Sequence, residues 1–112
     1  MNSKPIIIVA GEPYSIFFEI LFKSIGKVDN SIILIASKKL LFRQMKQLNY
    51  KLKINLIDKD KLNLSDLKKK YINLIDVNFK FKKTFDKISN KSNIYINECF
   101  KIALNLLRTN QY

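Results

Sequence analysis

The feature that most constrains the fold of this chain is a pair of short runs of aliphatic, largely β-branched residues. The first run is Ile6–Ala10, which ends at Gly11, and the second is Ile32–Ala36, which ends at Ser37. Each run is apolar at every position rather than at every second position, which is typical of a parallel strand with both faces buried. The two runs therefore predict two buried strands of a parallel sheet.

Helical patterns alternate with these strands. A helix is predicted over residues 15–25, with Ser15 as its cap and Gly26 at its C-terminal end. A second helix, over 38–48, is capped by Ser37, and a third, over 93–107, has candidate caps from Ser89 to Ser92. The apolar rows predicted to face the core are Leu41, Met45 and Leu48 in the second helix, and Ile96, Cys99 or Phe100, Ala103 and Leu107 in the third.

Two shorter apolar runs, Ile54–Ile57 and Tyr71–Val77, complete the predicted sheet. Residues 58–70 between them fit either one helical turn capped by Ser65 or a loop. Strands that alternate with helices predict an α/β fold, a three-layer sandwich with a mostly parallel sheet and right-handed crossovers. Because no strand follows the last helix, we expect residues 1–112 to form a single, truncated α/β domain, the N-terminal part of a longer enzyme.

The composition excludes several kinds of site. The chain has no His and one Cys among 112 residues. Ser-His-Asp triads, Cys-His pairs, His-ligated metals and internal disulfides therefore cannot be built from these residues. Cys99 lies on a predicted buried row without a dense positive cluster beside it, so we interpret it as a small buried hydrophobe rather than a reactive thiol. We predict no catalytic and no metal-binding residue in this segment.

The formal charge of +12 raises the question of a nucleic-acid partner. The charge is spread evenly, since residues 1–56 and 57–112 each carry a net charge of +6. Lys, Ile and Asn, which all have codons rich in A and T, make up 48 of the 112 residues, so base composition accounts for the lysines. We therefore expect no specific nucleic-acid partner, and we expect solvated faces at Lys68–Lys70 and at Lys80, Lys82 and Lys83.

No run of residues approaches the ~20 apolar positions that span a bilayer. The run Pro5–Ala10 is also shorter than the core of a signal peptide, which has ~7–15 apolar residues. We therefore expect no membrane partner and a cytoplasmic protein.

The turn after the first strand points towards a function. Ligands of open α/β sheets bind beyond the carboxyl ends of the strands, and the first such turn here begins with Gly11, Glu12 and Pro13. The turn has one Gly where a dinucleotide-binding fingerprint needs three, and it lacks the Lys-Ser/Thr pair of a phosphate-binding P-loop. These three residues are candidates for lining a cleft of another kind.

The stretch Lys4–Pro13, followed by Ile16 and Glu19, resembles the amino-terminal signature of the 4-hydroxythreonine-4-phosphate dehydrogenase family of pyridoxine (vitamin B6) biosynthesis. In that family a strand is followed by Gly-Asp/Glu-Pro-Ala-Gly-Ile-Gly-Pro-Glu and then by a helix. The resemblance covers essentially all of this chain, but only about the first third of a typical member.

The resemblance implies an incomplete portion of an isocitrate/isopropylmalate dehydrogenase-like fold, and an oxidoreductase that uses NAD and a divalent metal. Such an enzyme oxidises the secondary alcohol of 4-phosphooxy-threonine, and the resulting β-keto acid then loses carbon dioxide. The resemblance also implies a small phosphorylated substrate, metal ligands outside this chain, and a homodimer when the protein is complete. The 112 residues alone are expected to be inactive.

The residues that match the signature carry separate expectations. Gly11 and Pro13 shape the turn, whereas Glu12 either contacts a ligand in the cleft or is a solvated or helix-capping carboxylate. Glu19 is interpreted as a structural charge near the start of a helix. The family's Gly, Gly and Pro are replaced here by Ser15, Phe17 and Phe18. We interpret the two phenylalanines as core filling.

Two alternatives remain open. Another member of the isocitrate/isopropylmalate dehydrogenase-like superfamily would carry a similar turn, although those enzymes place Gly where this chain has Pro13. The other alternative is a non-catalytic, basic α/β module that binds nucleic acid or a protein.

Overall fold

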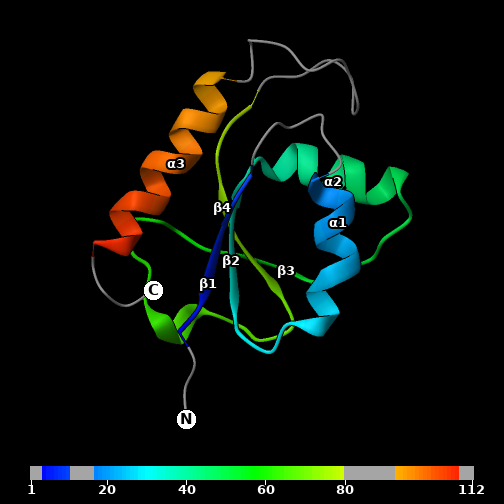
Figure 1. The fold of residues 1–112 in the computed structure, drawn as a ribbon, viewed down its shortest axis with the longest axis horizontal. Helices are drawn as coiled ribbons and strands as arrows, with labels where there is room; N and C mark the ends of the chain where they lie inside the picture. Colours follow the sequence, from blue (N-terminus) through cyan, green and yellow to red (C-terminus); the bar gives the residue numbers. More distant parts are fainter. Residues whose placement is uncertain (1–3, 11–16, 80–92, 109–112) are drawn as a thin grey trace.

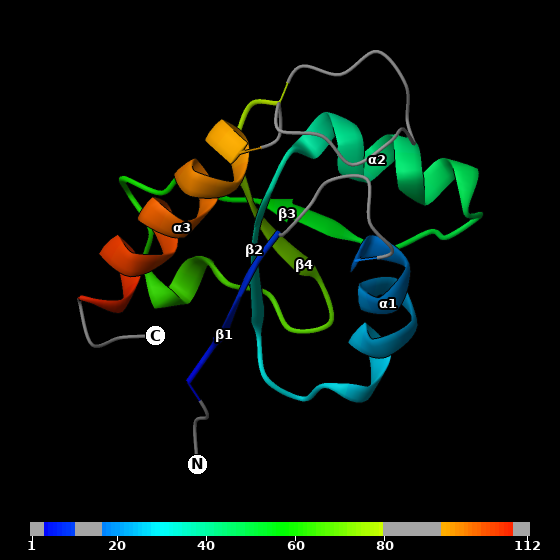
Figure 2. The same cartoon turned by 45° about the horizontal axis from the view of Figure 1, so that its top comes forward.

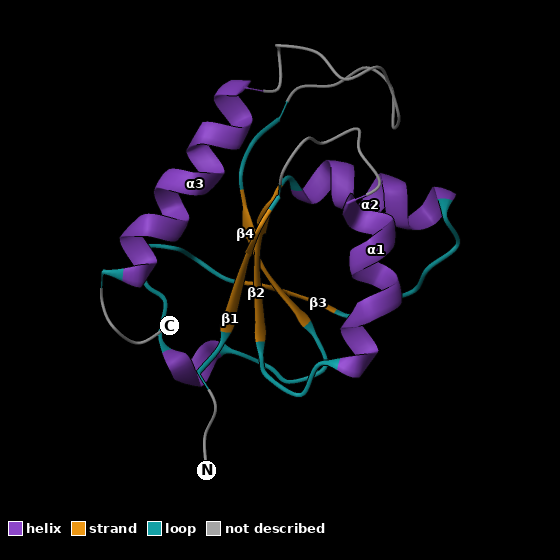
Figure 3. Ribbon diagram, in the orientation of Figure 1, coloured by secondary structure: helices purple, strands orange, loops and turns teal. Residues whose placement is uncertain are grey.

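The structure, a computed structural model, describes residues 4–10, 17–79 and 93–108. Within these residues, four strands form one all-parallel sheet in the order β1-β2-β4-β3 (Figures 1 and 3). Their bounds are β1 Ile6–Val9, β2 Ile32–Ala36, β3 Ile54–Leu56 and β4 Ile72–Asp76. All four strands were predicted from the sequence: the bounds of β2 are as predicted, and those of the other three differ by one residue at one or both ends.

In the described part of the chain, three α-helices cover the two faces of the sheet. They are α1 Phe17–Ser24, α2 Lys38–Gln47 and α3 Asn93–Leu107. Short 3₁₀ turns, η1 Ile25–Lys27 and η2 Leu64–Asp66, lie in the connections. Helices α1 and α2 lie on one face and α3 lies on the other, seen from two directions in Figures 1 and 2. The predicted three-layer α/β sandwich with a parallel sheet is confirmed.

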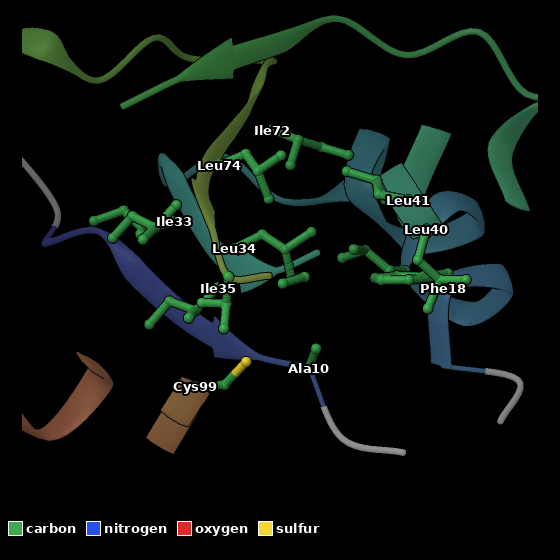
Figure 4. Packing of buried hydrophobic residues seen from close by; sticks show 14 of the residues in the cluster. Ala10, Phe18, Ile33, Leu34, Ile35, Leu40, Leu41, Ile72, Leu74 and Cys99 are labelled. Atoms are coloured by element: carbon green, nitrogen blue, oxygen red, sulfur yellow. The ribbon is translucent and has the colours of Figure 1, made fainter. Parts of the chain in front are cut away.

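The core lies on both faces of β2, whose five residues are all buried. On one face Leu34 packs towards Phe18 of α1 and Leu40 of α2 (Figure 4). On the other face Ile35 lies towards Cys99 of α3. An unbroken apolar run was therefore the correct signal for a central strand, since both of its faces are covered by helices.

The β1 strand differs from its prediction. It pairs with β2 alone and is an edge strand of the sheet in the described part of the chain. Ile6 is 41% exposed, and the next three residues of the strand are half-buried rather than buried. The interpretation of Ile6–Ala10 as a strand buried on both faces was wrong in this respect, because a run of β-branched residues specifies a strand but not its neighbours.

Helix α3 has the predicted bounds but turns a different row towards the sheet. Cys99 and Ala103 are buried as predicted, whereas Phe100 and Leu107 are 51% and 49% exposed. The buried row is Tyr95, Cys99, Ile102, Ala103 and Leu106. Of the two alternatives Cys99 and Phe100, Cys99 is the one that faces the sheet, and the prediction of Leu107 as core was wrong. The helix carries two apolar rows side by side, and packing against β1 and β2 selects one of them.

The predicted helix ends are confirmed in part. Ser37 caps α2, since its side-chain oxygen accepts a hydrogen bond from the amide of Leu40. Gly26 lies inside η1 and its φ is not positive, so it is not a left-handed cap of α1. Ser65 lies within η2, where Asn63 and Asp66 form the cap in its place. The proposed caps at Ser15 and at 89–92 lie outside the described residues.

Lys68–Lys70 are exposed, as predicted for a solvated face, whereas Lys80, Lys82 and Lys83 lie outside the described residues. Among the helices that the structure describes, none has both the length and the apolar character needed to cross a bilayer.

Candidate functional site

The carboxyl edge of the sheet is the candidate site, because ligands of open α/β sheets bind there. The ends of β1, β2 and β4 meet at this edge. The amide of Ala10, just after β1, donates to the carbonyl of Ile35 in β2 at 3.0 Å. The amide of Val77, just after β4, donates to the carbonyl of Ala36, the last residue of β2, at 2.9 Å. Ala10 is 2% exposed. Ala10, the last described residue after β1, therefore lies at the same edge as the start of α2.

The N-terminus of α2 is held at this edge by side chains from two distant elements. The backbone amide of Ser37 donates to the Tyr95 hydroxyl on α3, at 2.8 Å. The amide of Lys38 donates to the carboxylate oxygen Oδ1 of Asp76, at the end of β4, at 2.9 Å. These contacts occupy donors that a helix start leaves without intrahelical partners, and the carboxylate also complements the helix dipole.

These contacts also decide how an anion could bind here. With the amides of Ser37, Lys38 and Leu40 donating to protein atoms, they are not free to cradle a phosphate. Positive charge is still present, because Lys38 and Lys39 form the first turn of α2 and the Lys39 side chain is exposed. An anionic group at this edge would therefore be attracted by ammonium groups rather than by the helix amides.

Tyr95 and Cys99 form a buried pair behind the α2 N-terminus. Burial raises the pKa of the Tyr95 hydroxyl, with Cys99 adding to the shift, and burial raises the pKa of the Cys99 thiol to about 11. Tyr95 hydrogen-bonds to the sulfur, which partly opposes the shift of Cys99. Both groups are therefore protonated at neutral pH, so Cys99 is not an activated nucleophile and the sequence interpretation of it as a buried hydrophobe agrees.

The cleft candidates Gly11, Glu12 and Pro13 lie outside the described residues, as do Ser15 and Ile16. The structure describes the residues on either side: Ala10 ends at the carboxyl edge, and Phe17 begins α1.

The described signature residues have structural roles. Phe18 is 2% exposed, and its ring lies 5.3 Å from that of Phe17 and 6.0 Å from that of Phe22, so the interpretation as core filling is confirmed. The carboxylate of Glu19 lies 3.3 Å from the ammonium of Lys23, one helical turn later, in an exposed pair. Such a pair adds only a few tenths of a kcal/mol, about 0.3–0.5.

Sequence reasoning missed Asp76 and Tyr95. A weak signal for Asp76 was present, since an acidic residue at the end of an otherwise apolar strand lies at the carboxyl edge of a parallel sheet. No signal marked Tyr95, because its hydroxyl meets Ser37 only after the chain brings together residues 58 positions apart.

A second polar feature lies beside β3. An open groove of about 450 Å³ is lined by Asn55, Leu56, Ile57, Asp58, Lys61, Ser65, Asp66 and Lys68. The side-chain amide of Asn55, which lines this groove, donates to the carbonyl of Asp66 at 2.8 Å and to Oδ1 of the buried Asn73 at 2.9 Å. These bonds tether the 58–70 connection to the sheet, which is a structural role.

Comparison with known proteins agrees with the fold. No protein-family model matches this sequence, and no curated protein matches it. Among solved structures, a 4-hydroxythreonine-4-phosphate dehydrogenase from Burkholderia phymatum is similar, with a TM-score of 0.79 and 19% sequence identity over 99% of this chain and 34% of that chain. The resemblance inferred from Lys4–Pro13 is thus confirmed at the level of the fold. This chain has the fold of a part of a 4-hydroxythreonine-4-phosphate dehydrogenase and spans about a third of its length.

Proposed function

We propose that this chain is the N-terminal part of an NAD-dependent and metal-dependent dehydrogenase that oxidises and then decarboxylates 4-phosphooxy-threonine. The observation that carries the proposal is the fold match over 99% of the chain, which includes the strand and helix on either side of the Gly11-Glu12-Pro13 turn. In such an enzyme, NAD would supply the hydride acceptor, and a metal held by residues outside this chain would supply the charge that polarises the alcohol oxygen.

The described residues do not fit a metal centre. The chain has no His, and the described residues include no group of three or more His, Cys, Asp or Glu side chains that could hold an ion. The contribution of this chain is therefore to position groups. Asp76 and Tyr95 fix the start of α2, and β1 ends at the same edge with Ala10, which the Gly11-Glu12-Pro13 turn follows in the sequence. Lys38 and Lys39 supply the positive charge that suits a phosphorylated substrate or the cofactor pyrophosphate.

The test is a chimaera in which these 112 residues replace the matching third of the Burkholderia phymatum enzyme. With 4-phosphooxy-threonine, NAD and Mg²⁺ or Zn²⁺, we expect the chimaera to form NADH, measured by absorbance, and the 112 residues alone to form none. Substitution Glu12→Gln in the chimaera should lower kcat/KM at least tenfold, whereas the matched Glu19→Gln on the exposed surface of α1 should leave it within twofold.

Two outcomes would contradict the proposal. One is NADH formation by the 112 residues alone. The other is a chimaera that melts cooperatively but does not turn over 4-phosphooxy-threonine. Turnover of isocitrate or 3-isopropylmalate in its place would assign the chain to the wider superfamily.

A further inference from the structure

The segment that contains α2 concentrates positive charge that the even split between the two halves of the sequence conceals. Six of the nine basic residues in 1–56 lie between residues 38 and 53, and all three acidic residues of that half lie outside this segment. Five of the six basic side chains are exposed: Lys39, Arg43, Lys46, Lys51 and Lys53. Base composition accounts for the number of lysines in the chain, but not for a 16-residue segment without a carboxylate.

A hollow of about 250 Å³ opens beside the C-terminal end of α2, on the side of the molecule away from α3 (Figures 1 and 2). Phe42 at this hollow is 40% exposed, and the ammonium of Lys38 lies 6.0 Å from the centre of its ring. The residues that line the hollow are Phe42, Met45, Lys46, Asn49, Tyr50 and Lys51. This described lining combines two aromatic rings and a thioether with two ammonium groups and one amide, and it includes no carboxylate.

The end of α2 builds this hollow around a residue in the left-handed conformation. Asn49 has a φ of 61°, which Asn adopts more readily than most residues. Its amide donates to the carbonyl of Lys46 at 3.2 Å, and the amide of Tyr50 donates to that of Met45 at 2.9 Å, which are the two bonds of a Schellman cap. The Tyr50 ring packs on that of Phe22 in α1, with 5.3 Å between the ring centres. Backbone bonds and the core therefore hold the hollow in shape without a ligand.

The electrostatics at this end of α2 favour an anion. A helix C-terminus carries partial negative charge on carbonyls that lack partners. Here the carbonyls of Gln44, Met45 and Lys46 all accept backbone amides from the residues that follow the helix. The ammonium groups of Lys46 and Lys51 are exposed, and no ion pair among the described residues includes either of them. Two positive charges therefore flank the aromatic lining.

A planar base joined to a phosphate matches this combination of groups. Bases stack on aromatic side chains whatever their identity, and lysines neutralise the phosphates. A lipid surface would need a broad apolar face on the helix, but along α2, all of which the structure describes, Phe42 is the only exposed large apolar residue. An acidic peptide would use the ammonium groups and leave the aromatic rings without a partner. A single-stranded nucleic acid uses both kinds of group.

We propose that the hollow beside the end of α2 binds one nucleotide of a single-stranded nucleic acid, without sequence preference. The base stacks on the aromatic lining of Phe42 and Tyr50, and Lys46 and Lys51 neutralise the flanking phosphates. The side-chain amide of Asn49 both donates to and accepts from a base edge. Stacking and phosphate contacts carry no sequence information, so this binding agrees with the expectation of no specific nucleic-acid partner. It is separate from the proposed dehydrogenase function, whose site lies at the other end of α2.

The test is fluorescence anisotropy of the 112-residue chain with labelled oligouridylate RNA and oligothymidylate DNA of about 12 nucleotides, at about 50 and 200 mM salt. Two phosphates neutralised by Lys46 and Lys51 give a log–log salt slope of about −1.4, so this rise in salt should weaken binding at least about sevenfold. Lys46→Gln and Lys51→Gln should each make the slope shallower by about 0.7. The matched control Lys101→Gln, on α3 with a side chain that is 73% exposed, should leave the slope unchanged.

Substitution of Phe42 separates stacking from charge. Phe42→Ala should weaken binding at least about fivefold at both salt concentrations without a change in slope, and Phe42→Tyr should retain the affinity. Leu104→Ala removes a side chain that is 56% exposed on α3 and should have no effect on binding. Circular dichroism confirms that each variant is folded.

Anions without bases distinguish the other occupants. If polyphosphate or polyglutamate binds as tightly as the oligonucleotides, or if Phe42→Ala leaves their binding unchanged, the surface only attracts negative charge and the proposal is wrong. Tighter binding to phosphatidylserine vesicles would assign the surface to a membrane and would also overturn it, as would the absence of oligonucleotide binding at protein concentrations up to about 100 µM in the lower salt. Binding of either oligonucleotide with the expected effects of the variants supports the proposal, and a difference between the two identifies the strand as RNA or DNA.

Discussion

Deleting the Tyr95 hydroxyl tests whether α3 holds the start of α2. Tyr95 is 3% exposed, and its hydroxyl accepts a hydrogen bond from the amide of Ser37 at 2.8 Å. The Tyr95→Phe variant keeps the ring, including its contact with Phe79 at a centroid distance of 4.8 Å. It leaves the Ser37 amide without its acceptor in a site from which water is excluded.

The size of the effect follows from this loss. A buried amide without a partner costs about 1–3 kcal/mol, so we expect Tyr95→Phe to lower the free energy of unfolding by about 2 kcal/mol. An unfolding entropy of about 2.1 cal/mol/K per residue is roughly 0.24 kcal/mol/K for this chain, and the expected fall in Tm is therefore about 8 °C.

Urea denaturation followed by circular dichroism measures the change, with Tyr50→Phe as the matched control. Tyr50 is half-buried and packs its ring on Phe22 at 5.3 Å, so removal of its hydroxyl should cost less than about 0.5 kcal/mol. If Tyr95→Phe is also within about 0.5 kcal/mol of the natural sequence, then the hydroxyl does not serve the Ser37 amide and the assignment of α3 as a support for the site is wrong.

Two further predictions concern buried polar groups. Asn73 is fully buried; its side-chain amide donates to the carbonyls of Ile32 and Lys68, and its side-chain oxygen accepts from the amide of Lys68. We therefore expect Asn73→Leu to lower the free energy of unfolding by about 3 kcal/mol, measured by urea denaturation. An unchanged denaturation midpoint would contradict this role. Because burial raises the pKa of Cys99 to about 11, the folded state retains a proton that the unfolded thiol releases from about pH 9. Stability should therefore be complete below pH 9 and fall by up to about 1.4 kcal/mol per pH unit as the pH rises towards 11. Tyr95, whose pKa is also raised, extends the loss to higher pH, and Cys99→Ala should make the decline between pH 9 and 11 shallower in thermal melts.

The periodicity of apolar residues in the sequence was sufficient to predict the helices and strands. Runs such as Ile32–Ala36 can be satisfied only by a strand with helices on both faces, and Ser37 before Lys38 has the chemistry of a helix cap. These are local properties, in which the side chains that decide the structure lie within a few residues of one another. The resemblance in Lys4–Pro13 likewise needed only contiguous residues.

Less of the candidate site could be predicted from the sequence. The carboxyl edge and the turn after β1 were expected, but the contacts that fix the edge join Ser37 to Tyr95 and Lys38 to Asp76 across 58 and 38 residues. A one-dimensional pattern contains no distance between such residues. The same reason explains the cap of η2, where Asn63 rather than Ser65 satisfies the turn.

The sequence by itself determined the strands, the helices and the parallel α/β class, because these depend on the spacing of apolar side chains along the chain. Only the tertiary structure decided that β1 lies at an edge of the described sheet and that Tyr95, rather than Leu107, faces the sheet. Both outcomes depend on which surfaces meet. An apolar run or a doubly apolar helix offers more than one surface, and the choice among them is a free-energy difference between whole packed arrangements.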